Sequence, residues 1–447
     1  MCRIRKGTGI NMENYTSKII SVEKALELVK SDSCIVTSVA AGEPQLFLSQ
    51  LHTIADRVKN VNVNLCLSLR SYPFFESKEY EDSFEIVSWF HGPGARKAQK
   101  IRKVTYCPNH LRYMAKKRMS VIHPNIFVGT GTYPDEKGFV SLSLSNIYEK
   151  EVIEQADIII IEINKNCPRT FGGVEISVND IDYLIEADYP MIEVPSAEPN
   201  EKDLTIGKYI AEYIKDGDCL QLGIGGIPNA VAKSLYDKKD IGIHTEMLTT
   251  EMVALAKAGV INGSKKQIDK GKMVATFAMG TKEMYDYMDN NPSILILSSA
   301  YITDPNIIAQ NDNQVSINTT LEVDLTGQCC SEALGQVQFS GTGGQTDTAN
   351  GAQLSKNGRS FIALYSTAMV RNPETGEKEE VSKIVCQLKP GAAVSLSRND
   401  IDYLVTEYGV VNLKGRAISE RVELIISIAH PKFREQLMQD AKNAGLI

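Results

Sequence analysis

The chain carries the stretch Cys219-Leu-Gln-Leu-Gly-Ile-Gly-Gly-Ile-Pro228, followed further on by Gly242-Ile-His-Thr-Glu-Met247. The apolar start of the first stretch predicts a buried strand over Cys219–Leu222, and its glycines predict a turn over Gly223–Gly226. A helix is expected to begin at Pro228, because the missing N–H of a proline would have no partner in a first helical turn. The free amides of such a turn, placed at a helix N-terminus, are suited to hold an anion.

The second stretch predicts another strand, Gly242–His244, with Glu246 just beyond its end. Strands joined by a helix usually run parallel in an open sheet, and ligands bind at the edge formed by the carboxyl ends of such strands. One carboxylate and one anion-stabilising turn are therefore expected at the same edge.

Composition limits the possible functions. The chain has 447 residues, of which 43% are apolar and 23% charged, as in ordinary globular proteins. The formal net charge of -7 argues against a nucleic-acid partner, and no apolar run approaches the about 20 residues that a membrane-spanning helix needs. Nine scattered cysteines form neither a disulfide framework nor a zinc motif, so we expect a cytoplasmic protein without a bound metal. Residues Met1–Ile10 are expected to be disordered, and Met12 is an alternative start.

An internal repeat organises the chain. The segment Asn179-Asp-Ile-Asp-Tyr-Leu184 recurs without change at Asn399–Leu404, which is improbable by chance. The strand, turn and helix predicted over Cys34–Val39, Ala40–Pro44 and Pro44–Leu51 likewise resemble those predicted for the opening stretch. The sequence therefore predicts two copies of one α/β plan.

The two copies predict two domains, 1–194 and 204–447, joined by the polar, proline-containing linker Pro195–Asp203. Unbroken apolar runs such as Ile158–Ile163 are typical of strands that are buried on both faces. We therefore expect two similar, open and largely parallel α/β domains with the active site in the cleft between them. The first copy lacks a counterpart of Glu246 and is expected to form the far wall of that cleft.

A second glycine-rich loop, Gly341–Gly344, follows an apolar stretch and adds another group of backbone amides. Two such loops in one domain exceed what chain reversal requires, and together they could hold an oxyanion and the phosphate-bearing end of a cofactor. Two other interpretations stay open for the first loop. One is a dinucleotide-binding fingerprint, which Pro228 disfavours because a glycine is expected there for close helix packing, and the other is a tight turn without a ligand.

Four motifs carry a resemblance to a known family: Leu220–Val231, Gly242–Met247, Gln338–Asp347 and Asp402–Val410. With them the sequence resembles the acetyl-CoA hydrolase/transferase family over nearly its whole length. Within that family it is most similar to the short-chain acyl-CoA:acetate CoA-transferases that act on 4-hydroxybutyrate or butyryl-CoA.

The resemblance implies that Glu246 is the nucleophile and that both glycine loops contact CoA. The implied contacts are Gly223, Ile224, Gly225, Gly226 and Ile227 in the first loop and Gly341, Gly343 and Gly344 in the second. Arg371 is expected to replace a phosphate-contacting lysine of the family. The family usually has bulky apolar residues beside Asp347, whereas this chain has Thr346 and Thr348, so the acyl channel is expected to differ in shape.

The implied activity is transfer of CoA from butyryl-CoA or 4-hydroxybutyryl-CoA to a carboxylate such as acetate, by a ping-pong mechanism through a glutamyl-CoA thioester. CoA would be a substrate and part of the covalent intermediate, with no permanently bound cofactor. The family also suggests a homodimer or a larger homo-oligomer. Two alternatives stay open: an acyl-CoA (acetyl-CoA) hydrolase that admits water to the same intermediate, and a CoA- or dinucleotide-binding protein without transfer activity.

Two further groups of polar residues have competing interpretations. His244 is either a general base or a residue that orients the loop, and we favour the second because a glutamate ionised at neutral pH needs no base. The acids of the repeated segments Asn179–Leu184 and Asn399–Leu404 are interpreted as scaffold, since one copy lies in the half without the nucleophile.

Overall fold

The computed structural model describes residues 15–372 and 375–447, so the disorder predicted for Met1–Ile10 and the start at Met12 lie outside the described residues. The chain forms two compact units. The N-terminal unit contains the chain up to Pro195 together with Met247–Thr250 and Val274–Ile302, and the C-terminal unit contains Ser196–Glu246, Glu251–Met273 and Thr303–Ile447. The continuous domains predicted from the sequence, 1–194 and 204–447, stay a prediction.

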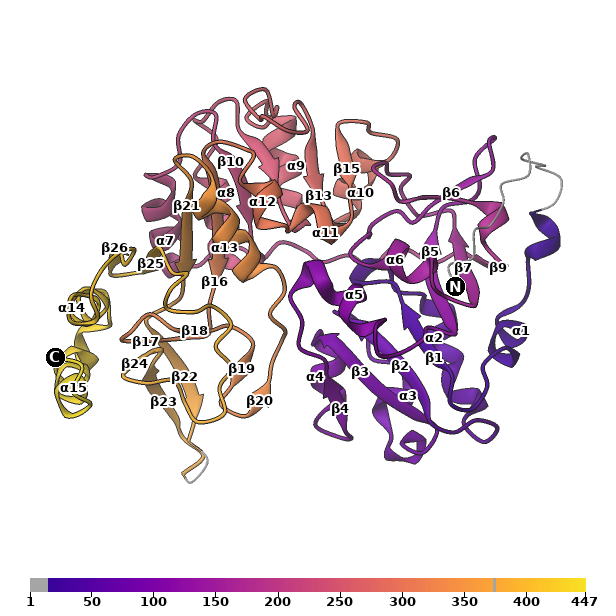
Figure 1. Ribbon diagram of the computed structural model, residues 1–447, viewed down its shortest axis with the longest axis horizontal. Coiled ribbons are helices and arrows are strands. Elements are labelled where there is room, and N and C mark those ends of the chain that lie inside the picture. The colour runs from indigo at the N-terminus through magenta and orange to yellow at the C-terminus, as the bar shows by residue number, and fades with distance from the viewer. Residues whose placement is uncertain (1–14, 373–374) are drawn as a thin grey trace. The chain divides into compact units, whose positions relative to one another are not determined.

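A seven-stranded sheet forms the centre of the N-terminal unit (Figure 1). In sheet order its strands are β4 (Val104–Tyr106), β3 (Phe84–Phe90), β2 (Val61–Cys66), β1 (Cys34–Thr37), β5 (Ile126–Gly131), β7 (Ile158–Asn164) and β9 (Tyr183–Ala187). All neighbouring pairs are parallel. Every residue of β5 is buried, as is all of β7 after its first residue, which confirms the prediction of strands buried on both faces.

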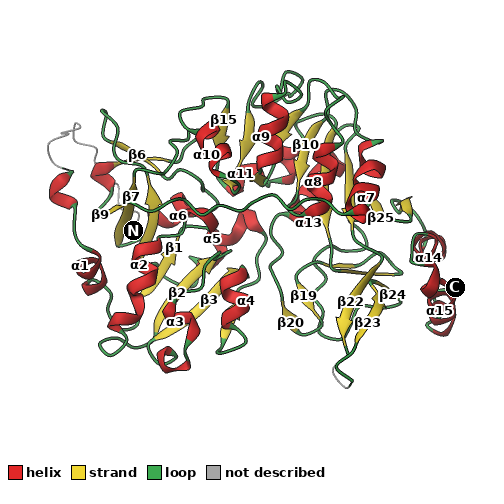
Figure 2. Ribbon diagram, turned by 180° about the vertical axis from the view of Figure 1, so that it is seen from behind, coloured by secondary structure: helices red, strands yellow, loops and turns green. Residues whose placement is uncertain are grey.

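Short helices accompany this sheet, as Figure 2 shows for α2, α3 and α4. The helices are α1 (Val22–Glu27), α2 (Gln45–Gln50), α3 (Pro73–Glu76), α4 (Pro93–Ala98), α5 (Met114–Arg118) and α6 (Glu149–Ile153). Phe47 and Leu48 of α2 belong to the same buried cluster as Ile35 of β1 and Val63 of β2. Burial of each such side chain stabilises the fold by about 1.5–3 kcal/mol, so the apolar side of α2 holds it on the sheet.

The C-terminal unit repeats this arrangement. Its parallel strands follow the order β11 (Gly242–His244), β10 (Cys219–Leu222), β16 (Gln314–Thr319), β21 (Arg359–Ala363) and β25 (Tyr403–Thr406), and β26 (Gly409–Asn412) pairs antiparallel with β25. The parallel strands correspond one by one to β2, β1, β5, β7 and β9 of the N-terminal unit. The matching order supports the predicted duplication of one α/β plan.

The remaining elements of the C-terminal unit surround this sheet or extend from it. The helices that lie wholly within it are α7 (Glu201–Ala211), α8 (Gly226–Lys233), α12 (Pro305–Ile308), α13 (Gln345–Leu354), α14 (Ile418–Ser427) and α15 (Pro431–Asn443). Helix α9 (Thr250–Lys257) and strand β13 (Met273–Ala275) each lie across a boundary between the two units. Small strands are β17 (Glu322–Asp324), β18 (Cys329–Cys330), β19 (Ala333–Leu334), β20 (Val337–Gln338), β22 (Thr367–Arg371), β23 (Lys378–Ser382) and β24 (Ile384–Val385).

The repeated six-residue segment has the same task in both units. Asp182 Oδ2 accepts a hydrogen bond from the backbone N–H of Ile159 at 2.9 Å, and Asp402 Oδ2 accepts one from Ser360 at 3.1 Å. In each case the next residue, Tyr183 or Tyr403, pairs in parallel with the residue after the donor. Each aspartate therefore aligns its strand with the neighbouring strand, which confirms the scaffold interpretation.

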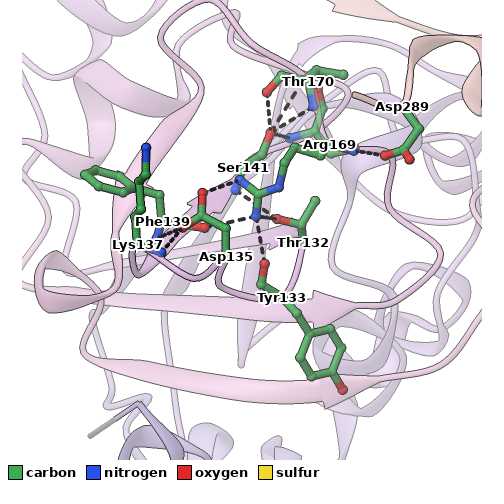
Figure 3. A network of polar contacts seen from close by, with 10 residues as sticks. Thr132, Tyr133, Asp135, Lys137, Phe139, Ser141, Arg169, Thr170 and Asp289 are labelled. Atoms are coloured by element: carbon green, nitrogen blue, oxygen red, sulfur yellow. Dashed lines mark hydrogen bonds and ion pairs between the residues drawn. The ribbon is translucent and has the colours of Figure 1, made fainter. Parts of the chain in front are cut away.

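Hydrogen bonds attach the late segment Val274–Ile302 to the N-terminal unit. The segment contains β14 (Phe277–Ala278), α10 (Lys282–Met288), β15 (Ile294–Ile296) and α11 (Ser299–Ile302). Other small strands of the N-terminal unit are β6 (Phe139–Ser141), β8 (Glu175–Ser177) and β12 (Met247–Leu248). The backbone amide of Arg169 donates to Asp289 Oδ1 at 2.7 Å, and the carbonyl of Arg169 accepts from the amide of Asn290 at 2.8 Å. Figure 3 shows the Arg169 guanidinium held in turn by Thr132, Tyr133, Asp135 and Phe139.

Two predicted boundaries are wrong by a few residues. Helix α8 begins at Gly226, so Pro228 is its third residue; a proline is tolerated there because the N–H groups of the whole first turn have no intrahelical acceptor. The predicted linker Pro195–Asp203 contains no helix or strand from Pro195 to Asn200, but its last three residues belong to a helix. Asn200 and Asp203 form a capping box, which starts α7 at Glu201.

The aspartate of the repeated segment predicts a stability effect. Asp402→Ala removes the acceptor of the Ser360 N–H and of the Asn412 side chain. Buried donors left without an acceptor destabilise a protein by about 1–3 kcal/mol, so the urea midpoint of Asp402→Ala should fall measurably. Asn399→Ala, at an exposed position of the same segment, should keep the parent midpoint. Equal midpoints for Asp402→Ala and the parent would contradict the scaffold role.

Candidate active site

Glu246 lies at its expected place, beyond the carboxyl end of β11. Strand β11 pairs in parallel with β10 through Cys219–Gly242 and Leu220–Ile243. The first glycine loop therefore leaves the same edge of the sheet as Glu246. The predicted bounds of both strands, Cys219–Leu222 and Gly242–His244, are confirmed.

The first glycine loop presents unoccupied backbone amides. Gly223 donates to the carbonyl of Ile317 at 2.9 Å, which anchors the start of the loop on β16. Gly225 caps α8 with a φ of 114°, a conformation that favours glycine. Within the described residues, the amides of 224–227 form no hydrogen bond. They meet the requirements of an anion site at a helix N-terminus.

Gly226 is required by a buried carboxylate behind the loop. A Cβ at this position would lie 2.3 Å from Asp203 Oδ2. Asp203 cannot give way readily, because it is 3% exposed and accepts hydrogen bonds from the amide of Asn200 at 3.0 Å and the hydroxyl of Tyr365 at 2.6 Å. Asp203 thus occupies the space that a side chain at position 226 would need.

The second glycine loop contacts Glu246 directly. The amide of Gly344 donates to Glu246 Oε2 at 2.8 Å, and α13 begins at the next residue. A Cβ at Gly344 would lie 2.3 Å from the same oxygen, so only glycine brings the backbone this close to the carboxyl group. The structure therefore unites Glu246 and Gly344 of the predicted site residues.

The electrostatic surroundings of Glu246 favour its neutral form. Removal of water from the carboxyl group raises its pKa to about 7; the nearby negative charge of Asp347 raises it too, and the Gly344 hydrogen bond lowers it. This shift runs against the expectation that Glu246 is ionised at neutral pH. The carboxylate, which is the nucleophilic form, is harder to form here than in an exposed glutamate.

His244 belongs to the scaffold behind the site. It is 1% exposed, and its Nδ1 lies 3.4 Å from the side-chain nitrogen of Asn311. Its carbonyl accepts a hydrogen bond from the side chain of Gln314 at 3.3 Å. These contacts agree with the orienting role favoured by the sequence analysis.

Among the described residues no hydrogen bond joins Glu246 or the second loop to Gly223–Ile227 of the first loop, and the same holds for Arg371. It ends β22 in an exposed hairpin, where its guanidinium donates to the carbonyl of Gly376 at 3.2 Å. No contact between described residues joins it to Glu246 or to either glycine loop. Its role as a phosphate contact stays a prediction.

Sequence reasoning did not identify two groups behind the loops. Asp203 could have been found, because Asn200 and Asp203 have the spacing of a capping box before an apolar helix. Glu332 and Ser395, which hold the second loop, carry no recognisable motif. They come from distant parts of the chain and meet only in the folded unit.

Comparison with known proteins decides the family. The chain matches the acetyl-CoA hydrolase/transferase N-terminal domain over residues 5–195 and the C-terminal domain of the same family over residues 280–441. The chain belongs to the acetyl-CoA hydrolase/transferase family. The resemblance inferred from the four motifs is thus confirmed.

Similar members of the acetyl-CoA hydrolase/transferase family extend over nearly the whole chain. A 4-hydroxybutyrate coenzyme A transferase from Clostridium kluyveri is 41% identical, with 96% of this chain and 98% of the relative covered. A succinyl-CoA:cyclohexane-1-carboxylate CoA transferase from Geobacter metallireducens is 39% identical, with 97% of each covered. A butyryl-CoA:acetate CoA-transferase from Anaerostipes caccae is 34% identical, with 97% and 98% covered.

The fold is also found among solved structures. The crystal structure of RipA from Yersinia pestis matches with a TM-score of 0.87 at 35% identity and covers 97% of this chain and 99% of RipA. The expectation of an α/β fold with parallel sheets is confirmed by this match. No helix among the described residues has the length and apolar character needed to cross a membrane.

The surroundings of Glu246 predict a measurable titration. Asp347→Asn removes a negative charge that disfavours ionisation, so the pKa of Glu246 should fall below its value of about 7. NMR titration of protein labelled at the glutamate carboxyl carbons measures it, with the signal assigned by its loss in Glu246→Gln. Glu435→Gln removes an exposed charge on α15 and should leave the titration unchanged. A pKa that is unaltered or higher in Asp347→Asn would contradict the assigned cause.

Proposed function

We propose that this protein is a CoA-transferase that moves CoA between a short-chain acyl-CoA and a carboxylate such as acetate, with Glu246 as the nucleophile. The observation that carries the proposal is the Gly344 amide, 2.8 Å from the Glu246 carboxyl group at the edge of a parallel sheet. Membership in a family of acyl-CoA enzymes supports the same chemistry.

The reaction begins with the ionised carboxylate of Glu246. One carboxylate oxygen attacks the thioester carbonyl and forms a C–O bond, the C–S bond breaks, and CoA leaves as a thiolate, which leaves a mixed anhydride of Glu246 and the acyl group. The thiolate then attacks the glutamyl carbonyl carbon, releasing the acyl group as a free carboxylate and leaving a glutamyl-CoA thioester. An acceptor carboxylate reverses these steps, so the thioester is conserved and no external energy source is consumed.

The Gly344 amide is placed to assist the second step. When the thiolate attacks the glutamyl carbonyl, negative charge develops on an oxygen of Glu246, and the Gly344 N–H already points at such an oxygen in the ligand-free site. A preorganised donor of this kind lowers a barrier by about 3 kcal/mol. The amides of 224–227 supply a second set of donors for an anionic part of the substrate, either an oxyanion or a CoA phosphate.

The proposed donor is butyryl-CoA or 4-hydroxybutyryl-CoA. The named substrates of the relatives differ at similar identity, 39% for the cyclohexane-1-carboxylate enzyme and 41% for the 4-hydroxybutyrate enzyme, so identity does not rank the acyl groups. A panel of acyl-CoA donors with acetate as acceptor measures the preference. We further propose a cytoplasmic homodimer or larger homo-oligomer, which light scattering of the purified protein tests.

The covalent intermediate gives the decisive test. Incubation with butyryl-CoA and no acceptor should attach CoA to Glu246, as seen in the intact mass, and hydroxylamine should remove it. The initial rate of attachment should rise with pH through about 7, because only the carboxylate attacks. Glu246→Ala should give no adduct.

The products with acetate present separate the alternatives. Accumulation of acetyl-CoA identifies a transferase, and accumulation of free CoA without acetyl-CoA identifies a hydrolase. Binding without either product would identify a protein that holds CoA without turnover and would contradict the proposal.

Arg371 gives a separate test of phosphate recognition. If its guanidinium contacts a CoA phosphate, Arg371→Gln should raise the KM for butyryl-CoA several-fold and leave the KM for S-butyryl pantetheine, which has no phosphate, unchanged. Lys378→Gln is the matched control, since Lys378 is exposed and lies opposite Arg371 in the β22–β23 ladder. Equal KM values for Arg371→Gln and Lys378→Gln would remove Arg371 from the site.

A further inference from the structure

Both sides of Gly344 are tied to one residue, Ser395. On one side the hydroxyl of Thr342 donates to Glu332 Oε2 at 2.9 Å, and the hydroxyl of Ser395 donates to the same oxygen at 2.7 Å. On the other side the hydroxyl of Thr346 donates to the carbonyl of Ser395 at 2.5 Å. The two threonines thus reach Ser395 from opposite ends of the loop.

Ser395 and Glu332 form a firm base for these bonds. They are 6% and 4% exposed, so little water competes for their oxygens. The amide of Ser395 donates to the carbonyl of Cys329 at 2.9 Å, and the amide of Ser331 donates to the Ser395 hydroxyl at 3.0 Å. The Glu332 carbonyl also accepts from Phe339 and Ser340, the residues that lead into the glycine loop.

The loop needs such support because its own backbone is permissive. Gly341, Gly343 and Gly344 lack the side chain that restricts φ and ψ, and Gly343 has a φ of 56°. A loop of this composition does not by itself hold one amide at a fixed distance from a carboxylate. The threonine hydroxyls add to the restraint given by the Thr348 amide, which donates to the Gly344 carbonyl, and by the Gln345 side chain, which bonds to Ser331 and Thr319.

We propose that Thr342, Glu332, Ser395 and Thr346 form a clamp, the Ser395 clamp, that fixes the Gly344 amide against Glu246. This inference deepens the proposed function and rests on it for its catalytic meaning. The four are positioning residues, because they act through Gly344. Displacement of an aligned group by about 1 Å can lower a rate on the order of a hundredfold, so the clamp has a direct kinetic consequence.

Thr346 supplies the arm of the clamp at the start of α13, because its hydroxyl donates to the Ser395 carbonyl. Thr348, two residues further on, turns instead toward the sheet, where it donates to the carbonyl of Gln345 and contacts Ser316 and Asn318. Thr346 and Thr348 therefore have different tasks, and of these two only Thr346 bonds to Ser395.

Thr346→Val tests the clamp because valine keeps the shape of threonine and removes its hydroxyl. The Gly344 hydrogen bond lowers the pKa of Glu246, so a loosened loop should raise that pKa and shift the acid limb of the rate profile to higher pH. We expect kcat with butyryl-CoA and acetate to fall about ten- to a hundredfold and the KM for butyryl-CoA to change less than twofold. Thr346→Ser, which keeps the hydroxyl, should restore the parent values of kcat and of the Glu246 pKa.

The control is Thr205→Val, which removes another helical hydroxyl, one that donates to the carbonyl of Glu201 in α7. It should match the parent in kcat and in the titration of Glu246. Asp347, the charged neighbour that also shifts this titration, is unchanged in every variant.

Several outcomes would overturn the clamp. An unaltered pKa of Glu246 in Thr346→Val would contradict the clamp. This holds even if activity and melting temperature fall together, since a loss of both without a pKa change means general destabilisation. Failure of Thr346→Ser to restore the pKa would do the same. If Thr346→Val does not fold, Thr342→Val tests the other arm by the same titration. The NMR titration needs no substrate, so an inactive parent would contradict the proposed function and leave the test of the clamp intact.

Discussion

The contact between the Gly344 amide and the Glu246 carboxyl group is the constraint on which the site depends. It requires a residue without a side chain at position 344, since a Cβ there would lie 2.3 Å from Glu246 Oε2. The same hydrogen bond lowers the pKa of Glu246. It thus opposes burial and the negative charge of Asp347, which raise that pKa to about 7. A carboxyl group poised in this way can be held neutral in the resting protein and still provide a nucleophile near neutral pH.

The duplicated sheet explains how this contact arises. Both units place the same strand order around a central strand, β1 or β10, and the C-terminal unit follows its central strand with the amides of 224–227, which form no hydrogen bond among the described residues. The corresponding turn of the N-terminal unit contains Glu43, a buried carboxyl group with a pKa raised to about 7 by burial, which accepts from the Ser68 hydroxyl and the Arg70 amide. One plan thus gives a turn with unbonded amides in one copy and a turn that contains a buried, hydrogen-bonded carboxyl group in the other.

Support behind the two loops follows one physical rule. Glycines allow the backbone to approach a ligand or a carboxylate, and buried polar residues then restrict the freedom that glycine introduces. Asp203 lies behind the first loop and leaves no space for a side chain at Gly226, and Glu332 with Ser395 bonds to Thr342 and Thr346 of the second. Substitution behind a loop is therefore expected to alter the chemistry at its open side.

The sequence by itself determined the elements and the candidate nucleophile. Strands Cys219–Leu222 and Gly242–His244 and the position of Glu246 follow from local patterns, because the apolar period and glycine sterics act over short stretches of chain. The repeat at Asp182 and Asp402 follows from comparison of two segments of the sequence. Only the tertiary structure decided that Gly344 contacts Glu246, that this carboxyl group resists ionisation and that Ser395 lies behind the loop. These facts depend on the packing of segments far apart in the chain, and a pKa depends on the water and charges around a group, which no local pattern encodes.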